Sequence, residues 1–217
     1  DFGSQVTQLI ARRVRETGIY CEIHPFQSVN AESIQAFGAR GVILSGGPAS
    51  VTEAKTPRAP QALFNGSIGL PVLGICYGEM TMVQQLGGDV FPCKSQEFGP
   101  AMVDVTGDCA LFEGVWKSGD QKQVWMSHGD RIESVPEGFR VAATSETSPY
   151  AVIADDSRRL YGVQFHPEVV HTPDGAALIN NFTRGICGCK STWTMAAFNE
   201  EQITKIKEQV GKGRVIC

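Results

Sequence analysis

The sequence has few histidines, no long hydrophobic run and no surplus of positive charge. Its 217 residues include 4 histidines and carry a formal net charge of −4. No segment approaches the ~20 consecutive apolar residues that a membrane-spanning helix needs. No basic stripe with interleaved aromatic residues gives a reason to expect nucleic acid. What is left is a globular chain, 42% hydrophobic and 19% charged, long enough to form one domain with a proper core.

The 7 cysteines do not form a recognisable framework. Their number is odd and they are scattered along the chain, which favours reduced thiols in a cytoplasm over a set of disulfides. Cys187 and Cys189 lie close together, but a zinc site needs a second such pair or histidines nearby, and the sequence offers neither. We therefore expect no metal in this part of the chain.

Short apolar strands alternate with helices in the first part of the sequence. Ser4 can cap a helix, and strands are expected over 19–24, 41–44 and 72–75, with helices over 31–37, before 65 and over 79–86. From residue 88 strands dominate, with a more antiparallel character. The pattern predicts an α/β fold: an open, mostly parallel central sheet flanked by helices, with a smaller antiparallel, strand-rich part.

The segment Gly74-Ile75-Cys76-Tyr77-Gly78 places a cysteine between glycines, after an apolar strand and before a helix. Small neighbours allow a sharp strand-to-helix bend that holds the corner side chain out into a cleft. The N–H groups at the start of the helix favour a thiolate there. A lone cysteine in such a turn is more often structural, so a partner is needed to make Cys76 a candidate nucleophile.

That partner is the segment Gln164-Phe165-His166-Pro167-Glu168. A thiol nucleophile needs a base, and the base needs a third group to fix its tautomer. His166 ends a strand-like run, and Glu168 follows it across a stiff proline. His128 also follows a strand, and spacing alone does not separate the two histidines as the base.

Taken together, these motifs resemble those of the class I glutamine amidotransferases. Within that family the resemblance extends along the whole chain to the glutaminase halves of glutamine-hydrolysing GMP synthases. It is carried by residues 1–5 (DFGSQ), 45–48 (SGGP), 125–130 (WMSHGD) and 164–168 (QFHPE). It implies the flavodoxin-like amidotransferase fold.

The resemblance also assigns roles to residues. It makes Cys76, His166 and Glu168 the catalytic triad, with the backbone N–H groups of Gly47 and Tyr77 as the oxyanion hole. Pro48 has no N–H to donate and Ala49 departs from phosphate loops, which favours the oxyanion role for this glycine-rich loop.

Substrate glutamine is implied to bind at Ser127, Gly129, Asp130 and position 80. At position 80 the family commonly has glutamine, whereas this chain has Met80, which is at best a weak hydrogen-bond acceptor. We expect weakened glutamine affinity or compensation by another residue.

The implied organisation is an amidotransferase domain over 1–189, followed over 190–217 by a linker and a helix capped at Asn199. These lead to an ATP pyrophosphatase (synthetase) domain beyond residue 217. The glutaminase part needs no cofactor, whereas ATP and magnesium belong to the synthetase part. The implied protein is a cytoplasmic ligase of purine biosynthesis, homodimeric at full length, that makes GMP from XMP.

Two alternatives stay open: the glutaminase subunit of another synthetase, making anthranilate or carbamoyl phosphate, and a non-catalytic flavodoxin-like module.

Overall fold

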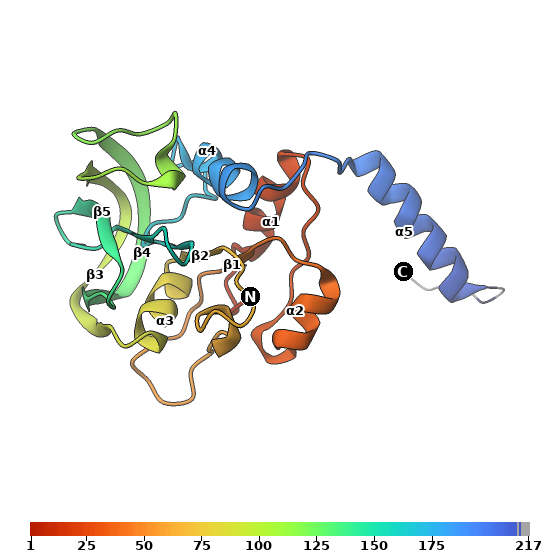
Figure 1. Ribbon diagram of the computed structural model, residues 1–217, viewed down its shortest axis with the longest axis horizontal. Coiled ribbons are helices and arrows are strands. Elements are labelled where there is room, and N and C mark those ends of the chain that lie inside the picture. Colours follow the sequence, from red (N-terminus) through yellow and green to blue (C-terminus); the bar gives the residue numbers. More distant parts are fainter. Residues whose placement is uncertain (212, 214–217) are drawn as a thin grey trace.

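The computed structural model describes residues 1–211 and 213, and the side chains of these except at 94–96, 195–198, 200–202 and 205. A seven-stranded sheet forms its centre, in the order β1-β2-β7-β6-β5-β3-β4. Figure 1 shows helices on both sides of β1 and β2, with α3 on one side and α1 and α4 on the other. The α/β class expected from the sequence is confirmed.

Three short strands form the parallel part of the sheet. They are β1 (Val42–Leu44), β2 (Val72–Ile75) and β7 (Leu160–Val163), and β2 lies between the other two. Every residue of β2 and β7 is buried, as expected for parallel strands covered on both faces. Their register pairs Gly74 of β2 with Gly162 of β7.

The antiparallel part continues the same sheet. It comprises β3 (Asp89–Val105), β4 (Gln121–Ser134), β5 (Arg140–Ser145) and β6 (Val152–Asp155). β7 pairs parallel with β2 on one side and antiparallel with β6 on the other, and so joins the two parts. Among the described residues, parallel pairing is confined to β1–β2 and β2–β7, so the expectation of a mostly parallel sheet is corrected to a mixed one.

The helices cover the parallel strands. α1 (Thr7–Glu16) packs against α4 (Gly175–Asn180), which continues through a π-helical turn, Asn181–Ile186. α2 (Ala31–Phe37) begins at an Asn30 capping box, and α3 (Tyr77–Gln85) contacts β1, β2 and β7. Ser4 does not cap α1, because the helix begins at Thr7 and the Ser4 hydroxyl instead accepts a hydrogen bond from the Val6 N–H, 3.2 Å away.

The strand expected over 19–24 is not formed. These residues and β1 line a shared cavity of about 620 Å³ and do not pair with each other. A hydrophobic segment becomes a strand only where another strand offers it backbone partners, and the outer edge of β1 does not do so here. The helix expected before residue 65 is reduced to a 3₁₀ turn, Gln61–Leu63, between prolines and glycines.

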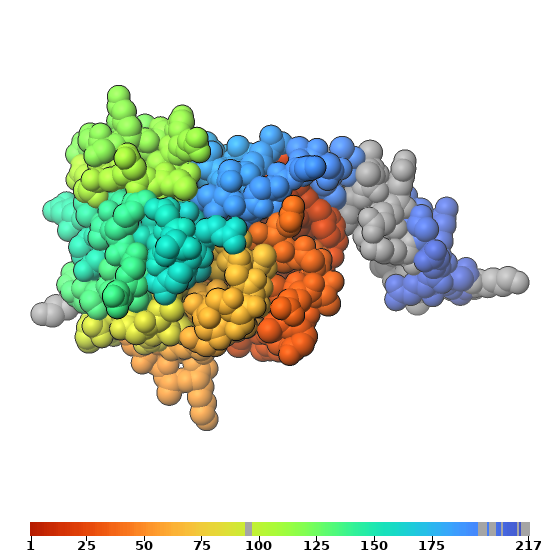
Figure 2. Space-filling model, viewed as in Figure 1, coloured from red at the N-terminus to blue at the C-terminus, as the bar shows by residue number. Residues whose placement is uncertain are grey.

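The end of the described chain is helical. α5 spans Met195–Val210 and extends away from the rest of the molecule (Figure 1). Asn199 therefore lies inside the helix and does not cap it. The space-filling view shows residues before 190 as one continuous body (Figure 2). Within the described residues, no helix has both the length and the hydropathy required to cross a membrane.

Candidate active site

Cys76 occupies the bend between β2 and α3. Its φ and ψ of 52° and −108° lie outside the usual regions for a residue with a side chain. The bend is fixed on both sides, because the Cys76 N–H donates to the Val163 carbonyl at 2.8 Å and α3 begins at the next residue. A side chain at Gly78 would overlap the backbone of Leu44. The predicted nucleophile elbow is therefore present.

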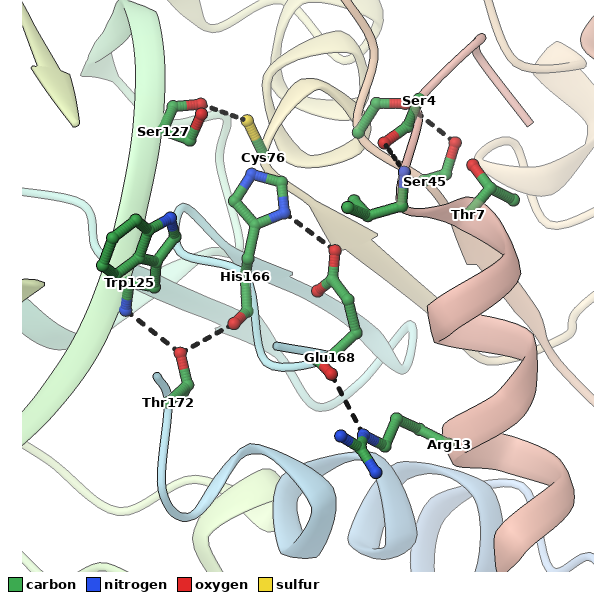
Figure 3. Close-up of polar contacts among 12 residues, drawn as sticks. Ser4, Thr7, Arg13, Ser45, Cys76, Trp125, Ser127, His166, Glu168 and Thr172 are labelled. Atoms are coloured by element: carbon green, nitrogen blue, oxygen red, sulfur yellow. Dashed lines mark hydrogen bonds and ion pairs between the residues drawn. The ribbon is translucent and has the colours of Figure 1, made fainter. Parts of the chain in front are cut away.

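His166 and Glu168 lie next to this bend. Figure 3 shows the imidazole between the Cys76 thiol and the Glu168 carboxylate, and His166 Nδ1 is 2.8 Å from Glu168 Oε1. The loop after β1 closes the site: a methyl group on Gly46 would lie 3.3 Å from His166 Cε1 and 3.9 Å from Cys76 Cβ. Residues distant in the sequence thus converge at one place, as a catalytic triad requires.

The electrostatics of the site favour a charged imidazole. Burial by itself lowers the pKa of His166, but its hydrogen bonds to Cys76 and Glu168, and the charges of those two groups, raise the pKa to about 10. Glu168 is fully buried and His166 is 8% exposed. The arrangement can hold an imidazolium beside a thiolate, which is the resting state of many thiol hydrolases.

Three contacts that the sequence did not reveal hold the triad in place. The Thr172 hydroxyl donates to the His166 carbonyl at 2.7 Å and accepts from the Trp125 N–H at 3.0 Å, and so ties His166 to β4. From α1, Arg13 Nε donates to the Glu168 carbonyl at 3.0 Å (Figure 3). Neither residue belongs to a motif, and their positions follow only from the packing of distant elements.

The glycine-rich loop at 45–48 lies where an oxyanion loop is required. Gly47 packs against Phe2 and the ring of Tyr77, the residue after Cys76. Among the described residues, no protein group accepts a hydrogen bond from the N–H of Gly47 or Tyr77. Both predicted donors are therefore without a protein acceptor in the described residues, and their contact with an oxyanion stays a prediction.

The predicted substrate residues lie on β4, whose Ser127 contacts the thiol. The Ser127 carbonyl accepts from Cys76 Sγ at 3.4 Å. Asp130 is buried, and one of its carboxylate oxygens accepts from the Val51 N–H at 3.1 Å. Gly129, between them, is half-buried. Ser127 therefore borders the site, and the roles of Ser127, Gly129 and Asp130 in binding substrate stay predictions.

His128 is held away from the thiol. Its Nδ1 lies 2.9 Å from the Asp130 carbonyl and its Nε2 lies 3.1 Å from Glu97 Oε2. Because both ring nitrogens are already engaged, the geometry favours His166 as the base and resolves the choice that spacing left open. The remaining histidines lie elsewhere: His24 is half-exposed beside Glu22, and the His171 ring packs on Trp125.

Residues 79 and 80 of α3 are both buried. Met80 is 3% exposed and brings no polar group to the position where the family commonly has glutamine. Glu79 is fully buried with neither carboxylate oxygen hydrogen-bonded to protein. The described part of the chain holds no group of three or more histidine, cysteine or acidic side chains arranged to bind a metal ion.

Comparison with known proteins identifies the family. The model of the family "Glutamine amidotransferase class-I" matches residues 1–186. This chain belongs to the class I glutamine amidotransferases. Over all its 217 residues the amidotransferase chain is 59% identical to glutamine-hydrolysing GMP synthases of Rhizobium rhizogenes and Brucella melitensis. It spans only 41% and 42% of the lengths of those two relatives.

A solved structure is also similar over nearly its full length. It is the crystal structure of a candidate GMP synthase subunit from Thermoplasma acidophilum, with a TM-score of 0.71 and 32% sequence identity. The similarity covers 93% of this chain and 94% of that one. The amidotransferase fold inferred from the sequence motifs is thus supported by a structure of matching extent.

Proposed function

We propose that this amidotransferase chain hydrolyses L-glutamine to glutamate and ammonia, and that the ammonia serves the amination of XMP to GMP. The observation that carries the proposal is the Cys76 thiol at a strained elbow, in contact with an imidazole that is oriented by a buried carboxylate. That set is suited to acyl transfer through a thioester. The 59% identity to GMP synthases over the whole chain favours GMP synthesis over anthranilate or carbamoyl phosphate synthesis.

The proposed reaction begins with attack of the Cys76 thiolate on the glutamine side-chain carboxamide. The tetrahedral oxyanion accepts hydrogen bonds from the N–H groups of Gly47 and Tyr77, each typically worth about 3 kcal/mol of barrier. The imidazolium of His166 protonates the leaving nitrogen, so ammonia departs and a γ-glutamyl thioester remains. His166 then takes a proton from water, which attacks the thioester to release glutamate and the thiolate. Glu168 holds the imidazole throughout.

Binding of the substrate is assigned to β4 and α3. In this proposal backbone groups of Ser127 and Gly129, together with the Asp130 carboxylate, hold the amino-acid end of glutamine. A carboxylate opposite the substrate ammonium supplies a charge-assisted hydrogen bond. Met80 brings no polar group to this proposed binding role, so the glutamine side chain would have one contact fewer than in family members with glutamine there.

The whole protein is proposed to be a cytoplasmic ligase of purine biosynthesis. Residues 1–189 form the amidotransferase domain, and 190–217 form a linker and helix that lead to an ATP pyrophosphatase domain. The relatives are more than twice as long as this chain, which leaves room for such a domain. The synthetase domain would bind ATP and magnesium, whereas the glutaminase part needs neither. We expect the full-length protein to be a homodimer.

A glutamine analogue that carries an electrophilic group in place of the side-chain carboxamide tests the proposal directly. We expect it to alkylate Cys76 alone, located by peptide mass spectrometry, and free glutamine to slow the labelling. Cys76→Ala should abolish both labelling and glutamine hydrolysis, while the matched variant Cys189→Ala should retain both. Labelling spread over several cysteines, or turnover retained without the Cys76 thiol, would refute the assignment and favour the non-catalytic alternative.

A further inference from the structure

The start of the chain packs along the glycine-rich loop at 45–48. A Cβ added at Gly47 would lie 2.9 Å from the Phe2 carbonyl oxygen and 3.1 Å from Phe2 Cβ. A Cβ added at Gly3 would lie 3.7 Å from Pro48 Cδ, so the contact continues at the next residue of each segment. Phe2 therefore lies directly against Gly47, with no room between them for a side chain on the glycine.

A serine of the same loop fixes the backbone at Phe2. The Phe2 N–H donates to Ser45 Oγ at 3.0 Å, in a buried contact. The Ser45 hydroxyl lies 2.8 Å from the Gly46 carbonyl oxygen and 3.3 Å from Asp1 Oδ1, so its proton has an acceptor in either direction. The same Asp1 oxygen accepts from the hydroxyl of Thr7, the first residue of α1, at 2.7 Å, and Figure 3 shows Ser45 and Thr7 near the start of that helix. The backbone at Phe2 is thus tied to the loop and, through Asp1, to α1.

The ring of Phe2 contacts Tyr77, the residue after the nucleophile. The two ring centroids are 5.3 Å apart and the ring planes meet at 63°, an edge-to-face arrangement that aromatic pairs favour. Both side chains are buried. The Tyr77 ring is also held at its far end, because its hydroxyl donates to the Pro57 carbonyl at 2.7 Å. Phe2 therefore touches Gly47 with its backbone and Cβ, and Tyr77 with its ring.

The two proposed oxyanion donors belong to separate elements. Gly47 lies in the loop after β1, whereas Tyr77 begins α3. An oxyanion hole works only when its N–H groups lie about 2.7–3.1 Å from the developing charge. A displacement of about 1 Å in an active site can cost about 100-fold in rate. A residue that contacts both elements can therefore fix the separation of the two donors.

We propose that Phe2 is a positioning residue of the oxyanion hole, which holds the N–H groups of Gly47 and Tyr77 at a fixed spacing while Ser45 locks Phe2 to the loop. The inference rests on the proposed glutaminase function and extends it to a residue outside the triad and the substrate site. Phe2 acts through the two donors and not on the reacting atoms. Its loss should therefore slow the steps in which charge develops on the carboxamide oxygen, and should leave glutamine binding and the reactivity of the Cys76 thiol in place.

The first test replaces the ring. Phe2→Leu keeps an apolar side chain but loses the ring contact with Tyr77, so kcat for glutamine hydrolysis should fall by about 10- to 100-fold, with KM within about twofold of wild type. Alkylation of Cys76 by iodoacetamide forms no oxyanion, so its rate should stay within about twofold of wild type. Phe26 supplies the matched control, since its ring lies 6.2 Å from the Phe2 ring in the same cluster. Phe26→Leu should lower the urea midpoint without lowering kcat.

The second test removes the hydrogen bond from the loop. Ser45→Ala takes away the acceptor for the Phe2 N–H, so kcat should fall by about 3- to 10-fold, again with little change in KM. Because both substitutions act on one contact, the double variant should lose less than the product of the two single losses. Full kcat in Phe2→Leu, a loss no larger than that in Phe26→Leu, or alkylation slowed as much as hydrolysis would overturn the inference. A wild-type chain that hydrolyses no glutamine, alone or with an added synthetase domain, would instead refute the proposed function on which it rests.

Discussion

Cys76 has a backbone conformation that departs from ordinary geometry within the site itself. A non-glycine residue at φ 52° and ψ −108° costs on the order of 1–3 kcal/mol and persists only where its surroundings enforce it. Here the Val163 carbonyl fixes its N–H, and Gly78 lets the first turn of α3 approach Leu44. The strained backbone at Cys76 directs the thiol toward His166. Because β2 and α3 hold this residue on both sides, the strain cannot relax.

The pKa of His166 depends on Glu168, and this dependence can be measured. Glu168→Gln removes one of the interactions that raise the pKa to about 10, so the imidazolium should be lost at lower pH. We expect glutamine hydrolysis to fall by about 10²–10⁴-fold. The imidazolium-dependent part of the Cys76 alkylation profile should shift toward acid. The exposed residue Glu53 supplies the control, since Glu53→Gln should leave both measurements unchanged.

For Met80 we predict that a substitution improves the enzyme, whereas the substitution at Glu168 impairs it. Met80→Gln restores a hydrogen-bonding amide beside the proposed substrate pocket, so the KM for glutamine should fall by about 3- to 10-fold, as one net hydrogen bond predicts. kcat should change little. Met82, two residues further along α3, is fully buried in the core, and Met82→Gln should destabilise the fold without lowering KM. An unchanged KM in Met80→Gln would remove this position from the substrate site.

At the scale of elements, the site depends on how closely α3 approaches the parallel strands. A Cβ at Gly78 would meet Leu44 C at 2.7 Å and Leu44 Cβ at 2.8 Å, and backbone atoms of β1 cannot move aside cheaply. Gly78→Ala should therefore lower the free energy of unfolding by at least about 1–3 kcal/mol. Gly185→Ala, where an added Cβ meets nothing within 4 Å, is the matched control. Equal urea midpoints for the two variants would contradict this account.

The elements that carry chemistry were the most predictable from sequence. The bend at Cys76 and the His166-Pro167-Glu168 turn combine local conformational signals with known chemistry, and both are where the sequence placed them. The segment 19–24 was not predictable, because its state depends on a pairing partner and not on its own hydrophobicity. The strand-rich character after residue 88 was predictable, but the length of β3 and its irregular register were not.

Residues that act through packing were also beyond the sequence. The burial of Glu79 against Gly74 and Gly162 requires the register of β2 and β7, which the sequence does not reveal. Thr172 and Arg13 reach the triad from elements whose positions no local pattern specifies. For such residues the spatial arrangement is the only available signal.

At the scale of the whole molecule, this chain spans about two fifths of the length of its GMP synthase relatives. If ammonia is used by an adjoining synthetase domain, glutamine hydrolysis without that domain would waste it. We therefore expect slow hydrolysis by this chain alone, and at least about a fivefold increase when a separately purified synthetase domain with ATP and XMP is added, as a coupling of about 1–3 kcal/mol allows. Rates that are equal with and without the added domain would show that no coupling exists. Bovine serum albumin at equal mass is the control.

The order of strands separates the reaction centre from most of the polypeptide. The chain leaves the centre after α3, builds β3, β4, β5 and β6, and returns in β7 beside the strand from which it departed. The exposed turn at Lys117–Gly119 lies in this part of the chain, between β3 and β4. A sequence inserted into that turn would lengthen the segment between α3 and β7 without moving either end of that segment. A fluorescent reporter or an affinity handle can therefore be carried there while the thiol and the imidazole keep their places.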